Sequence, residues 1–177
     1  MSENKLETSL HIFKSRLETL RAILLRARKE LFPGSDDMSP IMGARLAEDM
    51  LPFPYQITYA CAQPRQFLAW LKDETPSDPN KDIETLSFSD LYQQVEDTIA
   101  EIEAASTDPD ESLINRDKTI QIPPDRSFVL SGAEYVDEWL VPNFYFHIVA
   151  AYAILRARGL KIGKADYMAH LMPKIMS

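Results

Sequence analysis

His147 and Asn143 are the residues of this chain whose types and spacing point most directly to chemistry. They lie one helical turn apart in the least polar stretch of the sequence, residues 139–159, WLVPNFYFHIVAAYAILRARG. An imidazole can bind a metal ion or transfer a proton, and a carboxamide both donates and accepts hydrogen bonds. Both residues are therefore candidates for a functional site.

The spacing of this stretch predicts a bundle helix with the polar pair turned inward. Alternating steps of four and three residues, which are typical of a helix packed against neighbours, connect Val136, Leu140, Asn143, His147, Ala150, Ile154 and Ala157. A buried polar group without a partner costs about 1–3 kcal/mol, so both side chains need partners inside the bundle. We expect Tyr145 and Tyr152 to line the edge of this polar pocket.

A second predicted helix offers a polar partner. Its apolar face consists of Phe53, Ile57, Ala60, Pro64, Phe67 and Leu71. Gln56 stands seven residues after Asp49 and seven before Gln63, which aligns the three on one edge of a continuous helix. Pro52 and Pro54 interrupt that helix at its start, where Asp49 is available as a cap. Gln56 is thus the interior polar candidate, and a rim amide is the alternative.

Length and charge set limits on the fold class and the partners. A chain of 177 residues fits one domain, here 1–177, with 160–177 as a C-terminal tail. The 19 Lys and Arg residues against 27 Asp and Glu residues give a net charge of −8, which argues against nucleic acid as a partner. A strongly acidic segment runs from Asp73 to Glu111, with Lys81 as its only basic residue. We interpret it as a solvated or ion-paired face.

Cysteine content and hydropathy indicate a cytoplasmic protein without a membrane span. Cys61 is the only cysteine, so no intramolecular disulfide or Cys-rich zinc site can form, and we expect a small core residue there. The N-terminal residues contain no apolar export signal. The uncharged stretch from Trp139 to Leu155 is 17 residues long, whereas a span normally needs about 20 apolar residues. We expect no membrane association.

The remaining segments predict a mostly helical fold. A regular apolar seam marks a first helix over residues 6–31, and capping-box residues at Ser87 and Asp90 start another over 88–102. Residues 72–86 form a polar connection. Two β-like runs, residues 119–122 and 128–130, predict a small hairpin before the last long helix.

Boundary signals complete this picture. Ser39 is a predicted cap with Pro40 in the first helical turn, and Ser131 marks the start of the last long helix. Pro142 removes a backbone donor inside that helix, so a kink or a restart is expected just before Asn143. Gly159 ends it.

Three sequence blocks carry a resemblance to a known family. They are RLAEDMLPFPYQITYAC at 45–61, VPNFYFHIVAAYAILRARG at 141–159 and GKADY at 163–167. On these blocks the chain resembles a subfamily of unknown function within the DinB/YfiT-like metalloenzyme superfamily. The resemblance implies an all-α antiparallel four-helix bundle, often dimeric. It also implies a metal ion held by a histidine of the second helix and an HxxxH pair of the fourth.

This chain departs from the implied metal site. His147 matches the second histidine of the pair, Asn143 stands at the first, and the second helix offers Gln56 or Asp49 where the family has histidine. Carboxamide oxygens are weak ligands for zinc or nickel, so we expect neither a metal nor another cofactor. The other histidines, His11 and His170, do not match ligand positions.

Three functions are compatible with these residues. The first is a small-ligand-binding bundle in which a degenerate metal site has become a polar pocket of His147, Asn143 and Gln56. The second, implied by the resemblance, is a metal-dependent thiol transferase, isomerase or hydrolase, with His147 as a ligand and Asp49 as the anionic candidate. The third is a structural or protein-interaction module, in which the polar pair only specifies packing.

Overall fold

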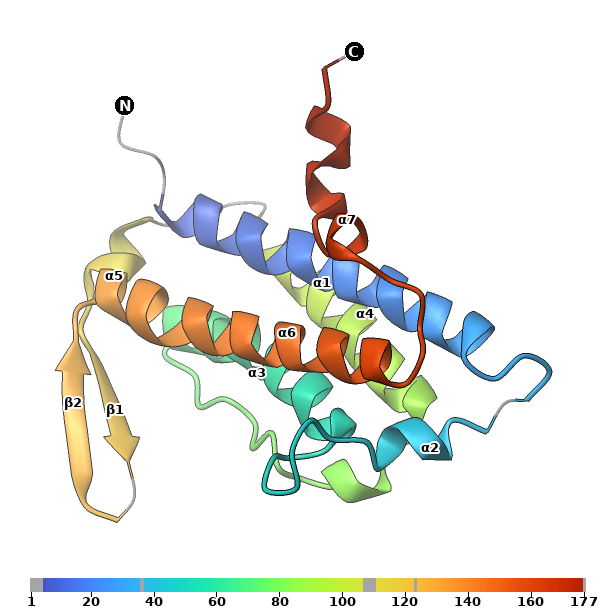
Figure 1. The fold of residues 1–177 in the computed structure, drawn as a ribbon. Helices are drawn as coiled ribbons and strands as arrows, with labels where there is room; N and C mark the ends of the chain where they lie inside the picture. The colour runs from blue at the N-terminus through green and yellow to red at the C-terminus, as the bar shows by residue number, and fades with distance from the viewer. Residues whose placement is uncertain (1–4, 36, 107–110, 123, 177) are drawn as a thin grey trace.

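Four helices form the body of the protein, shown in Figure 1 from a computed structural model. The structure describes residues 5–35, 37–106, 111–122 and 124–176. The long helices are α1 (Lys5–Glu30), α3 (Phe53–Leu71), α4 (Phe88–Ala105) and α6 (Val141–Ala157). Their apolar faces make one core, and the α1 seam from Leu6 to Ala27 is buried as its spacing predicts.

Contacts between helices define the order and direction of the bundle. Ion pairs join Lys14 to Glu103 and Arg21 to Glu96, so α1 and α4 run antiparallel. The helices α3 and α6 also run antiparallel, because the end of α3 contacts the start of the last helix through Trp70 and Tyr135. Around the bundle axis, α4 packs between α1 and α3, and α6 packs against both α3 and α1.

The other two neighbouring pairs run parallel. Phe53 stacks on Phe88 at 6.2 Å, and Arg65 pairs with Glu101 further along, so α3 and α4 start at the same end. The polar segment 72–87, which includes the short turn η1 (Ile83–Thr85), crosses back along the bundle to make this possible. The predicted four-helix bundle is therefore confirmed, with two antiparallel and two parallel neighbour pairs.

Side-chain caps start two helices where the sequence predicts them. Ser87 and Asp90 form a reciprocal capping box at α4, as do Ser131 and Glu134 at α5 (Gly132–Glu134). In both boxes the hydrogen bond from the serine hydroxyl, followed by that from its backbone N–H, lowers the pKa of the carboxylate. These caps satisfy backbone N–H groups that have no partner within a helix.

The other two predicted caps are wrong. Ser39 is the first residue of α2 (Ser39–Met42), which follows Met38. Asp49 is exposed, and α3 starts after Pro52 with no side-chain cap. Prolines fix the helical φ at both starts, which supplies much of the order that a cap would add.

A hairpin projects from the end of the bundle where α4 ends and the last helix begins (Figure 1). The strand β1 (Lys118–Ile122) pairs antiparallel with β2 (Arg126–Leu130), following the short turn η2 (Glu111–Asn115). Two strands alone are marginally stable. The hairpin gains support from the bundle, since Ile120 is buried and Phe128 packs against Trp139. The predicted hairpin is confirmed.

The last long helix contains a π-helical turn, which shifts the positions of the following side chains around the helix axis. Between α5 and α6, η3 (Tyr135–Leu140) is π-helical, and the Val141 N–H donates to the Val136 carbonyl five residues back. Pro142 follows directly, so the interruption falls where the proline predicts one. An extra residue in one turn rotates the following residues around the axis. A seam extrapolated through this turn is therefore displaced at Asn143, His147 and Ala157, although its Ala150 and Ile154 are buried.

The phase change moves the polar pair from the centre of the interface to its edge. Phe144 and Ile148 occupy the core, whereas Asn143 and His147 are half-buried and Ala157 is exposed. The prediction that Asn143 and His147 lie on the central seam is therefore wrong by one residue, although His147 still faces a neighbouring helix.

The C-terminal residues extend from the bundle along α1. Gly159 has a φ of +103° and ends the helix, as predicted. Leu160 and Ile162 are buried, and Arg26 of α1 binds both the Lys161 carbonyl and the Asp166 carboxylate. The short helices α7 (Lys164–Tyr167) and η4 (Ala169–Lys174) follow; α7 lies against α1, and from there the chain leads away from the bundle toward the C-terminus in Figure 1.

One helical stretch among the described residues, Gly132–Ala157, has the length and composition of a membrane span. It is also a core helix of the bundle, with Phe144, Ala151 and Leu155 fully buried. Core helices of soluble proteins meet the same criterion, so the stretch is weak evidence for a membrane.

Candidate functional site

His147 and Gln56 meet across the α3–α6 interface. The His147 Nδ1 lies 2.9 Å from the Gln56 Oε1, although the residues are 91 positions apart in the chain. Gln56 is 2% exposed, so the carboxamide belongs to the interior. Gln56 is therefore the predicted interior polar residue and not an amide at the rim of the bundle.

The second hydrogen bond of Gln56 fixes the protonation state of the histidine ring. The Gln56 Nε2 donates to the Leu51 carbonyl at 2.8 Å, so the carboxamide oxygen must face His147. An oxygen of this kind only accepts hydrogen bonds, and therefore the His147 Nδ1 carries the proton. The Nε2 of the neutral ring keeps its lone pair, and no group of the described residues donates to it. The ring is an oriented hydrogen-bond acceptor.

Burial keeps this ring neutral. Desolvation lowers the pKa of His147 from 6.5 to about 4, because the positive imidazolium loses its hydration at the helix interface. At neutral pH the side chain therefore offers a lone pair and not a positive charge.

Two aromatic rings lie close to the imidazole. Tyr59 of α3 lies edge-on to His147 with 5.1 Å between ring centroids, and Phe146 does so at 5.2 Å. The Tyr59 hydroxyl donates to the Asn80 Oδ1 at 2.5 Å, which ties the crossover segment to this edge of the bundle. Burial is the main cause that raises the pKa of Tyr59, so its hydroxyl stays protonated.

Gln63 adds a second acceptor on the same face of α3. Seven residues, almost two full turns, separate it from Gln56, so the two side chains lie on one edge of the helix. Its Nε2 donates to the Tyr59 carbonyl at 3.4 Å, while its Oε1 is buried without a hydrogen-bond partner among the described residues. A buried carbonyl oxygen without a donor is uncommon and costs free energy.

Asn143, one turn before His147, does not join this contact. Its Nδ2 donates to the Trp139 carbonyl of its own helix at 2.6 Å. The half-buried carboxamide is thus engaged locally, as an i to i−4 bond that any asparagine on a helix can make. It remains beside the site and is not part of the hydrogen-bonded pair.

Tyr145 and Tyr152 lie on another side of α6. Two and five residues from His147 correspond to turns of about 200° and 140° around the helix axis, given 3.6 residues per turn. Tyr145 faces Arg16 of α1, and Tyr152 packs against Tyr167. The prediction that they line the same edge as His147 is therefore wrong.

The donor set does not fit the metal ion that the superfamily resemblance implies. Of the three positions, only His147 supplies an imidazole; the Gln56 Oε1 already accepts from His147, and Asn143 offers only a carboxamide oxygen, which is a weak ligand. Asp49 is exposed. Among the described residues, no three His, Cys, Asp or Glu side chains gather in a way that could hold a metal ion.

Cys61 is a core residue. It is 1% exposed, and burial raises the pKa of its thiol to about 11, which removes the thiolate that a nucleophile requires.

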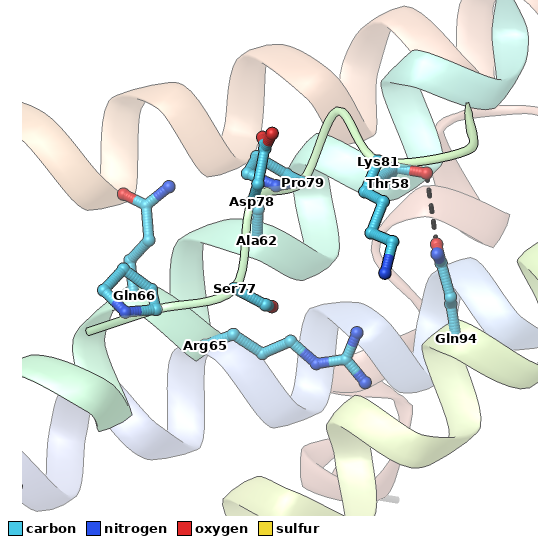
Figure 2. A pocket seen from close by; sticks show the side chains of 10 residues that line it. Thr58, Ala62, Arg65, Gln66, Ser77, Asp78, Pro79, Lys81 and Gln94 are labelled. Carbon is cyan, nitrogen blue, oxygen red and sulfur yellow. Dashed lines mark hydrogen bonds between the residues drawn. The ribbon is translucent and has the colours of Figure 1, made fainter. Parts of the chain in front are cut away.

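A small polar cavity lies on a different face of α3, beneath the crossover segment (Figure 2). Its volume is about 90 Å³, and its walls come from α3, α4 and residues 76–81. Thr58 donates to Gln94 at its side, and Arg65 and Lys81 contribute cationic groups. Thr58 and Arg65 face α4, whereas Gln56 and Tyr59 face α6, so this cavity is separate from the His147 contact.

The fold is that of a DinB-like helical bundle. The chain belongs to the family described as a domain of unknown function, DUF1993, whose profile matches residues 6–168. Its fold is similar to the crystal structure of a DinB family member protein from Shewanella denitrificans, determined at 1.83 Å resolution. The two chains share 26% identity and a TM-score of 0.72, over 90% of this chain and 88% of that one. No curated protein matches the sequence.

Two residues of this region escape sequence reasoning. Tyr59 stands three residues after Gln56, so helical spacing places it on the same face and provides a usable signal. Asn80 lies in a polar connection and reaches Tyr59 only because α3 and α4 run parallel, which sends the crossover segment back along α3. No local pattern predicts that contact.

Proposed function

We propose that this DinB-like protein binds a small molecule that donates a hydrogen bond to the His147 Nε2. The observation that carries the proposal is the chain of hydrogen bonds from His147 through Gln56 to the Leu51 carbonyl. This arrangement holds the ring in one tautomer and leaves a lone pair for a ligand. Preorganised groups of this kind bind ligands with little loss of conformational entropy.

The surrounding groups favour a particular ligand chemistry. The Gln63 Oε1 is a second acceptor on the same face of α3, and the rings of Tyr59 and Phe146 offer apolar contact. Two acceptors and aromatic walls suit an N–H or O–H donor with an apolar or aromatic body. An anion is disfavoured here, because both oriented groups present lone pairs.

A screen of fragments with N–H donors tests the proposal, with binding detected by amide NMR shifts of the full chain. We expect saturable binders that shift His147 and α3 resonances. Replacement of His147 by Phe keeps a ring but removes Nε2, and should weaken these binders about tenfold or more. Asn143→Leu is the matched control on the same helix and should leave their affinity within about threefold. Binders that tolerate His147→Phe would contradict the proposal.

The donor chemistry also bears on metal-dependent catalysis. The proposal treats the family metal position as degenerate, so protein purified without chelator should contain no stoichiometric zinc or nickel. One equivalent of either metal, lost on His147→Phe, would instead favour the metal-dependent transferase, isomerase or hydrolase.

The cellular location, the oligomeric state and the partners of the protein form part of the same proposal. A buried single cysteine suits a cytoplasmic location. The superfamily resemblance suggests a homodimer, which sedimentation velocity can test. The net charge of −8 disfavours nucleic acid as a partner.

A further inference from the structure

The polar cavity beneath the crossover segment brings together hydrogen-bond donors from three parts of the chain. Arg65 comes from α3, Gln94 from α4 and Lys81 from the crossover segment, and all three line one space of about 90 Å³. In Figure 2 the Lys81 side chain runs from the crossover segment toward Arg65 and Gln94. A space of this size has room for a few waters or for one small ion.

The guanidinium of Arg65 is held in place by an ion pair that leaves donors for the cavity. Its Nε and Nη2 each donate to a Glu101 oxygen at 2.9 Å, and the side chain is only 28% exposed. Its Nη1 has no hydrogen-bond partner in the part of the chain that the structure describes. Since a guanidinium carries five N–H donors in a fixed plane, Arg65 can bind a further oxygen atom without giving up Glu101.

The carboxamide of Gln94 contributes donors for the same reason of orientation. Its Oε1 accepts a hydrogen bond from the Thr58 hydroxyl at 3.1 Å, which is the dashed line in Figure 2. The Nε2 carries two N–H groups, and no described residue accepts a hydrogen bond from it. Gln94 therefore adds donors, and not an acceptor, to this side of the cavity.

Lys81 adds a positive charge that no carboxylate compensates. It is the only basic residue from Asp73 to Glu111, and it forms no ion pair with the described residues. Asp78 also lines the cavity, but its Oδ1 accepts from the Asn80 N–H and Nδ2 at 2.9 and 3.0 Å. In Figure 2 the Asp78 carboxylate points away from Lys81. The hydrogen bond from Tyr59 to Asn80 holds this part of the crossover segment against α3.

A larger cavity continues from the polar one between α3 and α4. It has a volume of about 540 Å³ and shares Arg65 and Ser77 with the polar cavity. Leu68, Ala69 and Ala105 contribute apolar surface to its walls. A molecule bound at Arg65 can therefore extend an apolar body into this second space.

We propose that Arg65, Lys81 and Gln94 bind the carboxylate of a small organic acid, whose body extends into the larger cavity. Charged donors make strong hydrogen bonds to a carboxylate. Glu101 compensates the charge of Arg65, so one positive charge remains, and a single charge matches a carboxylate better than a doubly charged phosphate. The site faces α4, whereas the Gln56–His147 contact faces α6, so it does not depend on the proposed function.

Titration of the full chain with acetate, hexanoate and inorganic phosphate tests the site. NMR follows the Arg65 Nε–H and the Gln94 side-chain amide at constant ionic strength, with sodium chloride as the balancing salt. We expect saturable shifts of both groups with the carboxylates, and an affinity for hexanoate at least about threefold higher than for acetate, because its body buries apolar surface.

Three results of this titration count against the proposal. Shifts that chloride reproduces, or that do not saturate, overturn the site. Tighter binding of phosphate than of either carboxylate contradicts the assignment of a single negative charge. Equal affinities for acetate and hexanoate contradict the placement of the acid's body in the larger cavity.

Variants separate binding from structure. Lys81→Met should weaken hexanoate about tenfold with an unchanged melting temperature, since Lys81 has no ion pair to lose among the described residues. Lys29→Met, at an exposed position of α1, makes the same change in net charge and is the matched control. Gln94→Leu should weaken binding several-fold, and His147→Phe should leave it unchanged. Unchanged affinity in both Lys81→Met and Gln94→Leu, or an equal loss in Lys29→Met, contradicts the site.

Discussion

The two antiparallel helix pairs of this bundle satisfy their buried polar groups in different ways. In α1 and α4, buried hydroxyls donate to carbonyls four residues back in their own helix, as do Ser9, Ser15, Thr19 and Thr98. In the α3–α6 pair, Gln56 reaches across the interface to His147, and the Gln63 Oε1 has no partner among the described residues.

This difference separates the parts of the sequence that build the bundle from the part that is available for function. A bundle needs apolar seams, and hydroxyls that bond to their own helix cost little there. A carboxamide and an imidazole that require each other across an interface add a constraint that packing does not need. For this reason the proposed ligand site is at the α3–α6 edge.

The largest expected effect concerns the apolar packing that builds the bundle. Leu17 of α1 is fully buried, so Leu17→Ala should lower the free energy of unfolding by about 2–5 kcal/mol, from lost burial and the cavity left behind. Leu25→Ala on the same helix is the control, because Leu25 is 56% exposed. Chemical denaturation measures both, and equal losses would show that the burial pattern is wrong.

The next effect tests the bond between α3 and α6. Gln56→Leu removes the acceptor of the His147 Nδ1–H and the donor to the Leu51 carbonyl, and should cost about 1–3 kcal/mol in unfolding free energy. Asn143→Leu, whose side chain bonds only to its own helix, should cost less than about 1 kcal/mol. A reversed order of the two variants in urea denaturation would remove the distinction between the cross-helix and local carboxamides.

The pH dependence of stability gives a smaller effect. The pKa of His147 is lowered to about 4, so between pH 6.5 and 4 the unfolded chain binds more protons than the folded one. Stability should therefore fall as the pH decreases through this window. We expect about 1–2 kcal/mol, after a discount for the solvent screening of a half-buried ring.

Comparison of variants isolates this contribution. His147→Phe should remove the corresponding part of the pH dependence, whereas Asn143→Leu should retain it. Denaturation curves at pH 7, 6, 5 and 4 provide the measurement. An unchanged pH profile in His147→Phe would show that the ring does not lose hydration on folding.

The smallest effect concerns the rim of the α1–α4 pair. Lys14 pairs with Glu103 at 2.9 Å near the surface, so Lys14→Met should change the unfolding free energy by less than about 1 kcal/mol, and even less in high salt. Thermal denaturation at two salt concentrations checks this. A loss comparable to that of Gln56→Leu would mean that surface charge, and not the polar edge, distinguishes the two pairs.

The fold was largely predictable because its signals are local and repeated. The α1 seam, the capping box at Ser87 and the hairpin before the last helix each follow from short-range spacing. The direction of α3 relative to α4 did not follow, because the crossover segment 72–87 carries no pattern that reports its path.

The site was predictable only in part, because the side chains of α6 are rotated around the helix axis relative to the pattern extrapolated from the sequence. Gln56 and His147 were selected as polar residues on apolar helices, and they do meet. The π-helical turn before Val141 rotated Asn143 away from the seam; Tyr145 faces Arg16 of α1, and Tyr152 packs against Tyr167. Helical extrapolation fails across such a turn, since one extra residue shifts every later side chain around the axis.

The tautomer and pKa of His147 provide the most direct test of the central claim, that this ring is a neutral acceptor held by Gln56. Long-range proton–nitrogen NMR of the imidazole measures both. We predict a proton on Nδ1, a lone pair on Nε2, and titration near pH 4. A proton on Nε2 at neutral pH, or titration near pH 6.5, would contradict the account.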